Sequence, residues 1–187
     1  MDNLIYLDAA FISAKFEEIT GKSGDAQFSK AEGGKVDVGF AFAKAGVHTQ
    51  ETITFKKSSN AMLRELLPKL RQDYPTIDLS IFKNYSGTQL AWVEGVMSLQ
   101  AWTDPAKPED RYDYYGLVVA NRKLALISEP AYFTSGFAQV INASSALIGY
   151  VGIPVQALVR VLWHVESTGE YVSAPLVLLE SRHSQTS

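Results

Sequence analysis

The chain has 187 residues, no cysteine and a formal net charge of −3. Because cysteine is absent, disulfides, thiolate zinc sites, iron–sulfur clusters and cysteine nucleophiles are excluded. A composition of 47% hydrophobic and 20% charged residues is typical of a folded globular protein. The net charge is negative and no run is rich in Lys and Arg, so nucleic-acid binding is unsupported.

Two segments bear on where the protein acts. The opening residues, Met1-Asp2-Asn3, lack the basic and apolar regions of a secretory signal, so we expect a cytoplasmic location. No Asp, Glu, Lys or Arg occurs between Glu129 and Arg160. Polar residues and glycines interrupt that stretch, and it therefore predicts a buried helix and a buried strand and no membrane span.

The N-terminal part predicts one strand, one helix and one loop. Residues 4–7 are apolar and predict a short strand, and an apolar stripe at helical spacing follows until Gly21. Asp8 stands between the two elements, where we favour a helix N-cap over a catalytic carboxylate. The polar segment 22–35 predicts a loop.

A change to period two predicts the next element. Residues 36–43 and 47–56 alternate in hydrophobicity and predict an antiparallel hairpin. One face of this hairpin is thin, which allows another element or a partner to approach closely. The small residues that we expect to face a partner are Gly39, Ala41, Ala43 and Gly46.

The remaining elements follow from the same patterns. A Leu-rich stripe after Ser59 predicts a second helix, in which Pro68 predicts a kink or a restart. The later predicted elements are strands at 77–81 and 90–99, strands at 117–120 and 124–127, a helix over 133–148, and strands at 155–165 and 171–179. The order predicts an α+β fold, a mainly antiparallel sheet of hairpins with about three helices packed on it, in a single domain of residues 1–187.

Residues 103–113 form the clearest break in composition and predict a long loop or a subdomain hinge. Carboxylates and tyrosines gather there and offer oxygen ligands or acid–base groups to a small ligand. A solvated charged loop is the competing interpretation. The candidate ligand-binding residues are Asp104, Asp110, Arg111, Asp113 and Tyr114.

No other residues form a catalytic, cofactor or metal motif. Phosphate-binding glycine strings and a G-x-S-x-G elbow are absent. The histidines are scattered, and we expect surface or hydrogen-bonded core roles for His48, His164 and His183. The tryptophans lie in apolar strands, so we expect core positions over ligand stacking for Trp92, Trp102 and Trp163. The sequence thus favours a protein that is not an enzyme and needs no cofactor or metal.

Several short strings resemble one bacterial family. They are Ile5-Tyr6-Leu7-Asp8, Ile12-Ser13, Glu18-Ile19-Thr20-Gly21, the segment 39–46, Glu51-Thr52 and the capped Leu-rich helix from Ser59. Together they are similar to the opening of the domain-of-unknown-function family 6414, and the resemblance covers about residues 4–70. None of the strings is a catalytic motif.

The resemblance implies a setting in anti-phage defence. Proteins similar to this family form the small component of the two-gene Dodola system, beside a ClpB-like AAA+ ATPase. The leading hypothesis is therefore a non-enzymatic sensor, adaptor or assembly module that works with a larger partner. One alternative is a small-ligand-binding protein or enzyme with a site near residues 103–116. Another is a homo-oligomeric assembly protein, which exposed hairpin edges would permit.

Overall fold

A computed structural model describes the fold. The described residues are 3–21, 26–30, 51–55, 59–79, 88–104, 107–134, 137, 152–165 and 170–181, and for 26–30, 51–55, 102–104 and 107–113 the description covers the backbone. The chain divides into two compact units, one of Ala9–Pro68 and one of Met1–Asp8 together with Lys69–Ser187. Strands dominate the described regular structure, which also holds two α-helices, so a mixed α and β fold is confirmed.

The smaller unit contains the first helix, α1 (Ala9–Thr20). Ile12 and Phe16, one turn apart, are buried on one side of it. The helix ends at Gly21, whose φ of 65° is the left-handed conformation that glycine adopts without strain. The Gly21 N–H donates to the Glu17 carbonyl at 2.9 Å, so the predicted helix stop is confirmed.

A two-stranded sheet of β2 (Ala26–Lys30) and β3 (Glu51–Phe55) lies in the same unit. The strands are antiparallel, with Phe28 opposite Ile53. The prediction of a loop over 22–35 is therefore wrong for the residues of β2. The described partner of β3 is β2. The segment Ala-Gln-Phe-Ser-Lys has a single large apolar residue, too few for a period-two signal. Residues 31–50, which include Gly39, Ala41, Ala43 and Gly46, lie outside the described residues.

The second helix, α2 (Ser59–Asp73), begins in the smaller unit and ends in the larger one. Pro68 lies inside it, and the helix is assigned as one element without a restart. The buried stripe consists of Met62, Leu63, Leu66 and Leu70. No described helix of the chain is long and apolar enough to cross a membrane.

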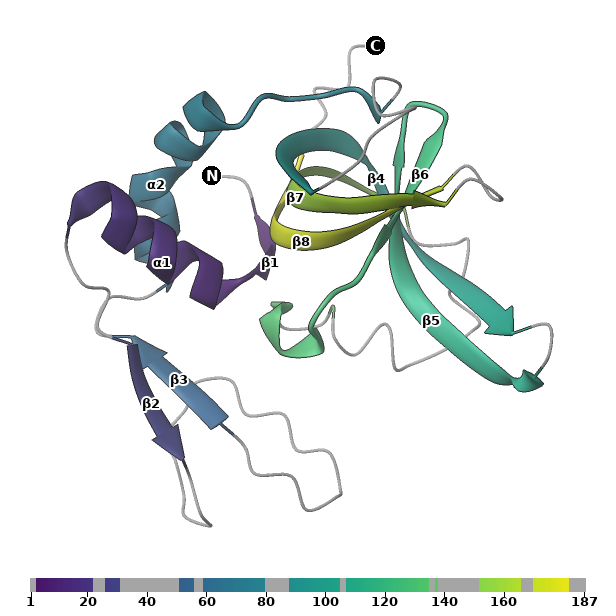
Figure 1. Ribbon diagram of the computed structural model, residues 1–187, viewed down its shortest axis with the longest axis horizontal. Coiled ribbons are helices and arrows are strands. Elements are labelled where there is room, and N and C mark those ends of the chain that lie inside the picture. Colours follow the sequence, from purple (N-terminus) through teal and green to yellow (C-terminus); the bar gives the residue numbers. More distant parts are fainter. Residues whose placement is uncertain are drawn as a thin grey trace. The chain divides into compact units, whose positions relative to one another are not determined.

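The larger unit is built on a closed barrel (Figure 1). Its strands are β4 (Gln89–Asp104), β5 (Lys107–Val119), β6 (Arg122–Leu126), β7 (Gly152–Val165) and β8 (Glu170–Glu180). Neighbouring strands pair in the order β4-β5-β6-β8-β7, and β7 pairs with β4 to close the ring. A further strand, β1 (Leu4–Leu7), pairs with the end of β8.

This closure corrects the expectation of a mainly antiparallel sheet of hairpins with about three helices packed on it. The strand β4 pairs with β5 on one side and β7 on the other, and register shifts interrupt the β7–β8 ladder at two places. Such bulges bend strands and allow a sheet to curl into a barrel. All pairings between described barrel strands are antiparallel except β6–β8, which is parallel. If the five barrel strands β4, β5, β6, β7 and β8 are numbered 1 to 5 in chain order, their order around the ring is 1-2-3-5-4.

A five-stranded Greek-key barrel in this order has the topology of the oligonucleotide/oligosaccharide-binding fold. One fold of this kind hosts many unrelated functions. The function must therefore be argued from the surfaces that this chain presents on the barrel.

Alternate residues of the barrel strands point into a shared apolar core. Its buried members include Val93, Leu117, Leu124 and Val159. Phe133, only 1% exposed, joins the same core. Its ring centroid lies 4.9 Å from that of Tyr6 and 5.0 Å from that of Tyr115.

The segment that carries Phe133 differs from its prediction. A 3-10 turn, η2 (Pro130–Tyr132), precedes Phe133, which is extended and forms a bridge with Tyr6. The predicted helix over 133–148 therefore does not begin at Phe133, and residues 138–150 lie outside the described residues. Pro130 fixes the first position of the turn, and the bridge to β1 then holds Phe133 extended.

Tyr115 makes the stability of the barrel sensitive to alkaline pH. Burial raises the pKa of the Tyr115 hydroxyl to about 12, and this hydroxyl donates to the Phe137 carbonyl at 2.7 Å. An unfolded tyrosine loses its proton near pH 10. Between these values the unfolded state binds fewer protons than the folded state, so the free energy of unfolding should fall as pH rises from about 10 to 12. Urea titrations of the wild type and Tyr115→Phe between pH 10 and 12 measure this change. An equally steep fall of the free energy of unfolding in the variant would contradict the role of Tyr115.

Candidate functional site

The segment predicted as a loop at 103–113 is a two-stranded ribbon. β4 pairs with β7 only as far as Ser98, and β5 pairs with β6 only from Tyr115 onwards. Residues 100–104 and 107–114 pair with each other and with no other described strand, and we call them the arm. Figure 1 shows this ribbon running out from the barrel. The prediction of a long loop is therefore wrong, because charged residues are tolerated in a ribbon that does not line the core.

The ladder of the arm spreads the predicted ligand residues along its length. Asp113 lies opposite Ala101, Arg111 lies opposite Thr103, and Asp104 lies opposite Lys107. Asp110 lies within β5. The register thus places no two of these carboxylates opposite each other. The backbone alone does not show a convergent site among them.

Tyr114 is the one predicted ligand residue whose side chain is described. It is half-buried, and its hydroxyl donates to Gln100 Oε1 at 3.3 Å. Burial raises the pKa of this hydroxyl, and the negative charge of Glu170 raises it further. Tyr114 therefore stays neutral and acts as a hydrogen-bonding group near neutral pH.

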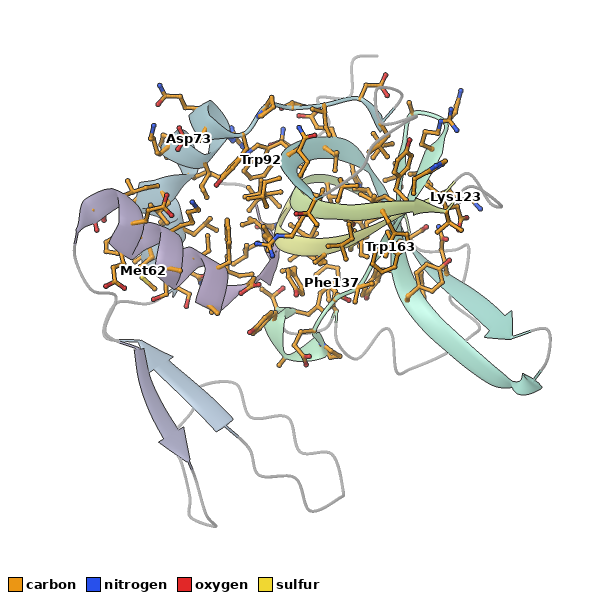
Figure 2. All side chains as sticks on the ribbon, in the orientation of Figure 1. Met62, Asp73, Trp92, Lys123, Phe137 and Trp163 are labelled. Atoms are coloured by element: carbon orange, nitrogen blue, oxygen red, sulfur yellow. The ribbon has the colours of Figure 1, made fainter. Side chains whose placement is uncertain are left out.

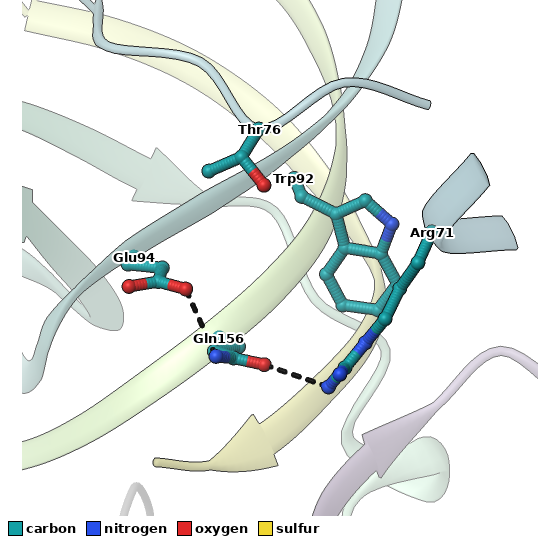
Figure 3. A pocket seen from close by; sticks show the side chains of 5 residues that line it. All are labelled: Arg71, Thr76, Trp92, Glu94 and Gln156. Carbon is teal, nitrogen blue, oxygen red and sulfur yellow. Dashed lines mark hydrogen bonds between the residues drawn. The ribbon is translucent and has the colours of Figure 1, made fainter. Parts of the chain in front are cut away.

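A small pocket of about 140 Å³ lies where the last turn of α2 meets the barrel (Figure 3). Its lining residues are Arg71, Thr76, Trp92, Glu94 and Gln156. Arg71 donates through Nη2 to Gln156 Oε1 at 2.9 Å, and Gln156 donates through Nε2 to Glu94 Oε1 at 2.9 Å. The Arg71 guanidinium also lies 5.9 Å from the centre of the Trp92 ring, within cation–π range.

These contacts indicate that the pocket residues have a structural role and connect the end of α2 to the barrel. Trp92 is buried, as predicted, and its indole N–H donates to the Leu70 carbonyl at 3.2 Å. Its backbone accepts from Ile77 N–H and donates to the Pro75 carbonyl, so the segment after α2 runs parallel to β4 at Thr76. The strands predicted at 77–81 and 90–99 therefore do not form an antiparallel hairpin over the described residues 77–79. The polar groups of the pocket bind one another, and they fasten the end of α2 to β4 and β7.

A second surface of the barrel is apolar and open. Trp163 of β7 lies opposite Val172 of β8, which in turn neighbours Ala125 of β6. Ile127 follows β6, and its N–H donates to the Ser173 carbonyl. We define the open face as the outer side of β6, β8 and β7, formed by Ala125, Ile127, Trp163, Val172 and Ala174.

The two large side chains of the open face are in contact with solvent. Ile127 is 56% exposed and Trp163 is 51% exposed. Figure 2 labels Trp163 on the ribbon. Charged residues border the face. Lys123 Nζ lies 3.7 Å from Glu170 Oε1, and the exposed Arg160 forms no ion pair with a described residue. An apolar strip with a charged border is thus accessible on the barrel.

A bulge in β7 explains why Trp163 faces outward. The register with β8 shifts between Val161 and Trp163, so that the buried Val161 is followed by an exposed Trp163. His164 then packs on Tyr171, with ring centroids 4.7 Å apart. The expected core position of Trp163 is therefore wrong. His164 Nε2 is buried without a hydrogen-bond partner among the described residues, which also differs from the expectation.

The other residues singled out in the sequence are Asp8, Trp102, His48 and His183. Asp8 directly precedes α1, and its N–H donates to the Leu176 carbonyl at 2.8 Å. Trp102 lies in the arm opposite Tyr112, and His48 and His183 lie outside the described residues. Over the described part of the chain, no group of three or more His, Asp and Glu residues could hold a metal ion.

Comparison with known proteins identified no relative of the chain. No family model matches the chain, and neither a curated protein nor a solved structure shows a significant match.

Proposed function

We propose that the chain is a non-enzymatic sensor or adaptor that docks a partner protein on the open face. The exposure of Trp163 and Ile127 at the two sides of one apolar strip carries this proposal. Contiguous exposed apolar patches with polar borders commonly mark protein interfaces. Tryptophan is also the residue type most enriched among those that dominate binding energy.

The chemistry of the open face favours protein over nucleic acid. Nucleic-acid binding draws most of its affinity from contacts between cationic side chains and phosphates. Among the described border residues, Lys123 is already paired with Glu170, which leaves Arg160 as the exposed cation. The chain as a whole has a net charge of −3. An apolar strip with one available cation suits a protein surface that carries apolar side chains and a carboxylate.

The resemblance of residues 4–70 to family 6414 supplies a setting for this proposal. In that setting the chain is the small component of an anti-phage defence pair, and its partner is a ClpB-like AAA+ ATPase. Co-expression with the neighbouring gene and size-exclusion chromatography test the pairing. If such a neighbour exists and the two proteins never co-elute, with or without ATP, this choice of partner fails.

Trp163→Ala should weaken the complex by a factor of ten or more, because a tryptophan that becomes buried at an interface is commonly worth about 2 kcal/mol. Co-elution and titration calorimetry with the ATPase measure the loss. Val96→Ala is the matched control, since Val96 of β4 is 42% exposed and lies outside the open face. Equal affinity of Trp163→Ala and the wild type would contradict a role for the open face, as would an equal loss in both variants.

A small-ligand site on the arm is the second candidate. The hydrogen bond between Tyr114 and Gln100 favours it, because it sets a phenol and an amide side by side at the base of an aromatic-rich ribbon. Thermal-shift screening with nucleotides and divalent ions tests it. A ligand at 100 times its dissociation constant adds about 2.7 kcal/mol to stability. If none of these compounds shifts the melting temperature, this candidate is removed.

A further inference from the structure

Among the described strands of the chain, the arm extends beyond the barrel as a pair without a third. Residues 100–104 of β4 and 107–114 of β5 pair with no other described strand. A ribbon of two strands is marginally stable in water unless something packs on it or adds to it. Its outer edges carry backbone N–H and C=O groups that can pair with another strand.

The two edges of the arm differ in their protection. The β5 edge begins with Lys107-Pro108 and continues with Glu109-Asp110-Arg111, so it carries proline and a run of charges. Both are devices that natural proteins use to prevent pairing of edge strands. The β4 edge, Gln100-Ala101-Trp102-Thr103, has neither a charge nor a proline and includes residues of high strand propensity. The β4 edge is therefore the one available for strand addition.

We propose that this edge pairs with the same edge of a second copy of the chain, antiparallel about a twofold axis at Trp102. In this register Ala101 lies opposite Thr103 of the other copy, and Gln100 lies opposite Asp104. Asp104, which follows this edge and ends β4, thus meets the Gln100 amide and no like charge. The result is one continuous sheet of four strands, in the order β5-β4-β4-β5. This self-complementary arrangement distinguishes a second copy from an arbitrary extended peptide.

The pairing involves few residues, so the dimer is weak and depends on concentration. Interfaces of this size fall at the low end of those that support specific association. Sedimentation equilibrium of the wild type should show dimers at high protein concentration and monomers on dilution. A wild type that stays monomeric at the highest soluble concentration would overturn the proposal.

Charge variants at positions 101 and 103 test the register. Ala101→Lys with Thr103→Glu places opposite charges across the dimer twice and should dimerise at least as tightly as the wild type. Ala101→Lys with Thr103→Lys, and Ala101→Glu with Thr103→Glu, place like charges there and should each be monomeric. Mixing the Lys/Lys and Glu/Glu proteins should restore dimers as heterodimers.

The mixing experiment also detects a variant whose arm has unfolded, because two unfolded arms would not restore pairing. Equal dimerisation of the Lys/Glu and Lys/Lys proteins, or no heterodimers on mixing, would overturn the register. Trp163→Ala provides the control for the open face and should leave this self-association unchanged. Loss of the dimer in Trp163→Ala would instead assign self-association to the open face and refute the arm interface.

Discussion

Gly95→Ala should lower the free energy of unfolding by about 3 kcal/mol or more, the upper range for overpacking in a closed interior. A Cβ atom at Gly95 would lie 2.1 Å from the Val118 carbonyl oxygen and 2.9 Å from its carbon. These are backbone atoms of β5, which is held between β4 on one side and β6 on the other. The clash therefore cannot be relieved by turning a side chain. Urea titration should show a lower midpoint with an unchanged slope.

Two other glycines of the barrel are matched controls for Gly95. A Cβ at Gly152 would meet only Val96 Cγ1, at 3.4 Å, so Gly152→Ala should change stability by less than about 1 kcal/mol. At Gly116 the added atom would meet the Gln100 side chain at 2.5 Å, and that side chain can move aside. The loss of stability in Gly116→Ala should thus lie between the losses in Gly95→Ala and Gly152→Ala. The same loss for Gly95→Ala and Gly152→Ala would contradict the close approach of β4 and β5.

Phe133→Ala should destabilise the barrel by about 3–5 kcal/mol, the usual cost of deleting a fully buried phenylalanine ring. Phe133 packs edge-on against Tyr6 and also against Tyr115, so the deletion opens a cavity beside two strands that are distant in the sequence. Thermal and urea unfolding measure the loss. Near-ultraviolet circular dichroism of the tyrosines should change with it.

The neighbouring ring gives the control for Phe133. Tyr132 is only half-buried and packs edge-on against Tyr6 at 5.8 Å, so Tyr132→Ala should cost clearly less than Phe133→Ala. Phe133→Leu, which keeps most of the apolar volume, should retain part of the lost stability. Equal losses for the two alanine variants would show that Phe133 is not part of the closed core.

Local patterns predicted the elements that local contacts stabilise. The apolar stripe and Gly21 predicted α1, and the apolar runs 117–120 and 124–127 predicted two paired strands that overlap the end of β5 and most of β6. The β7–β8 hairpin was predicted in the same way, with nearly the observed bounds. In each case the residues that pair are close in sequence, so turn chemistry and hydrophobic period suffice to indicate them.

The closure of the barrel could not be predicted from these patterns. The pairings that close it, β4 with β7 and β6 with β8, join residues separated by long stretches of chain. Hydrophobic period does not tell which strands become neighbours. The arm was missed for a different reason. Its charged residues have the composition of a loop, and a ribbon without a face in the core does not need the apolar alternation of a half-buried strand.

The candidate site depended on one backbone irregularity. Trp163 lies in the run Val161-Leu162-Trp163-His164-Val165, which has the composition of a buried strand. The bulge after Val161 decides which of these side chains face solvent, and a single added residue reverses the parity of all that follow. No local sequence motif predicts this bulge. The open face therefore emerges only once the register of β7 and β8 is known.

The pairing of β1 with β8 also constrains how the protein is made. Leu4 and Tyr6 lie opposite Leu179 and Leu178, so β1 can pair with β8 only after the long stretch of chain between them has been synthesised. At ordinary rates of translation this wait is on the order of ten seconds or longer. Throughout it, an apolar strand with unpaired backbone groups is exposed to other nascent chains. Molecular chaperones that bind short apolar segments would have a long opportunity to bind β1.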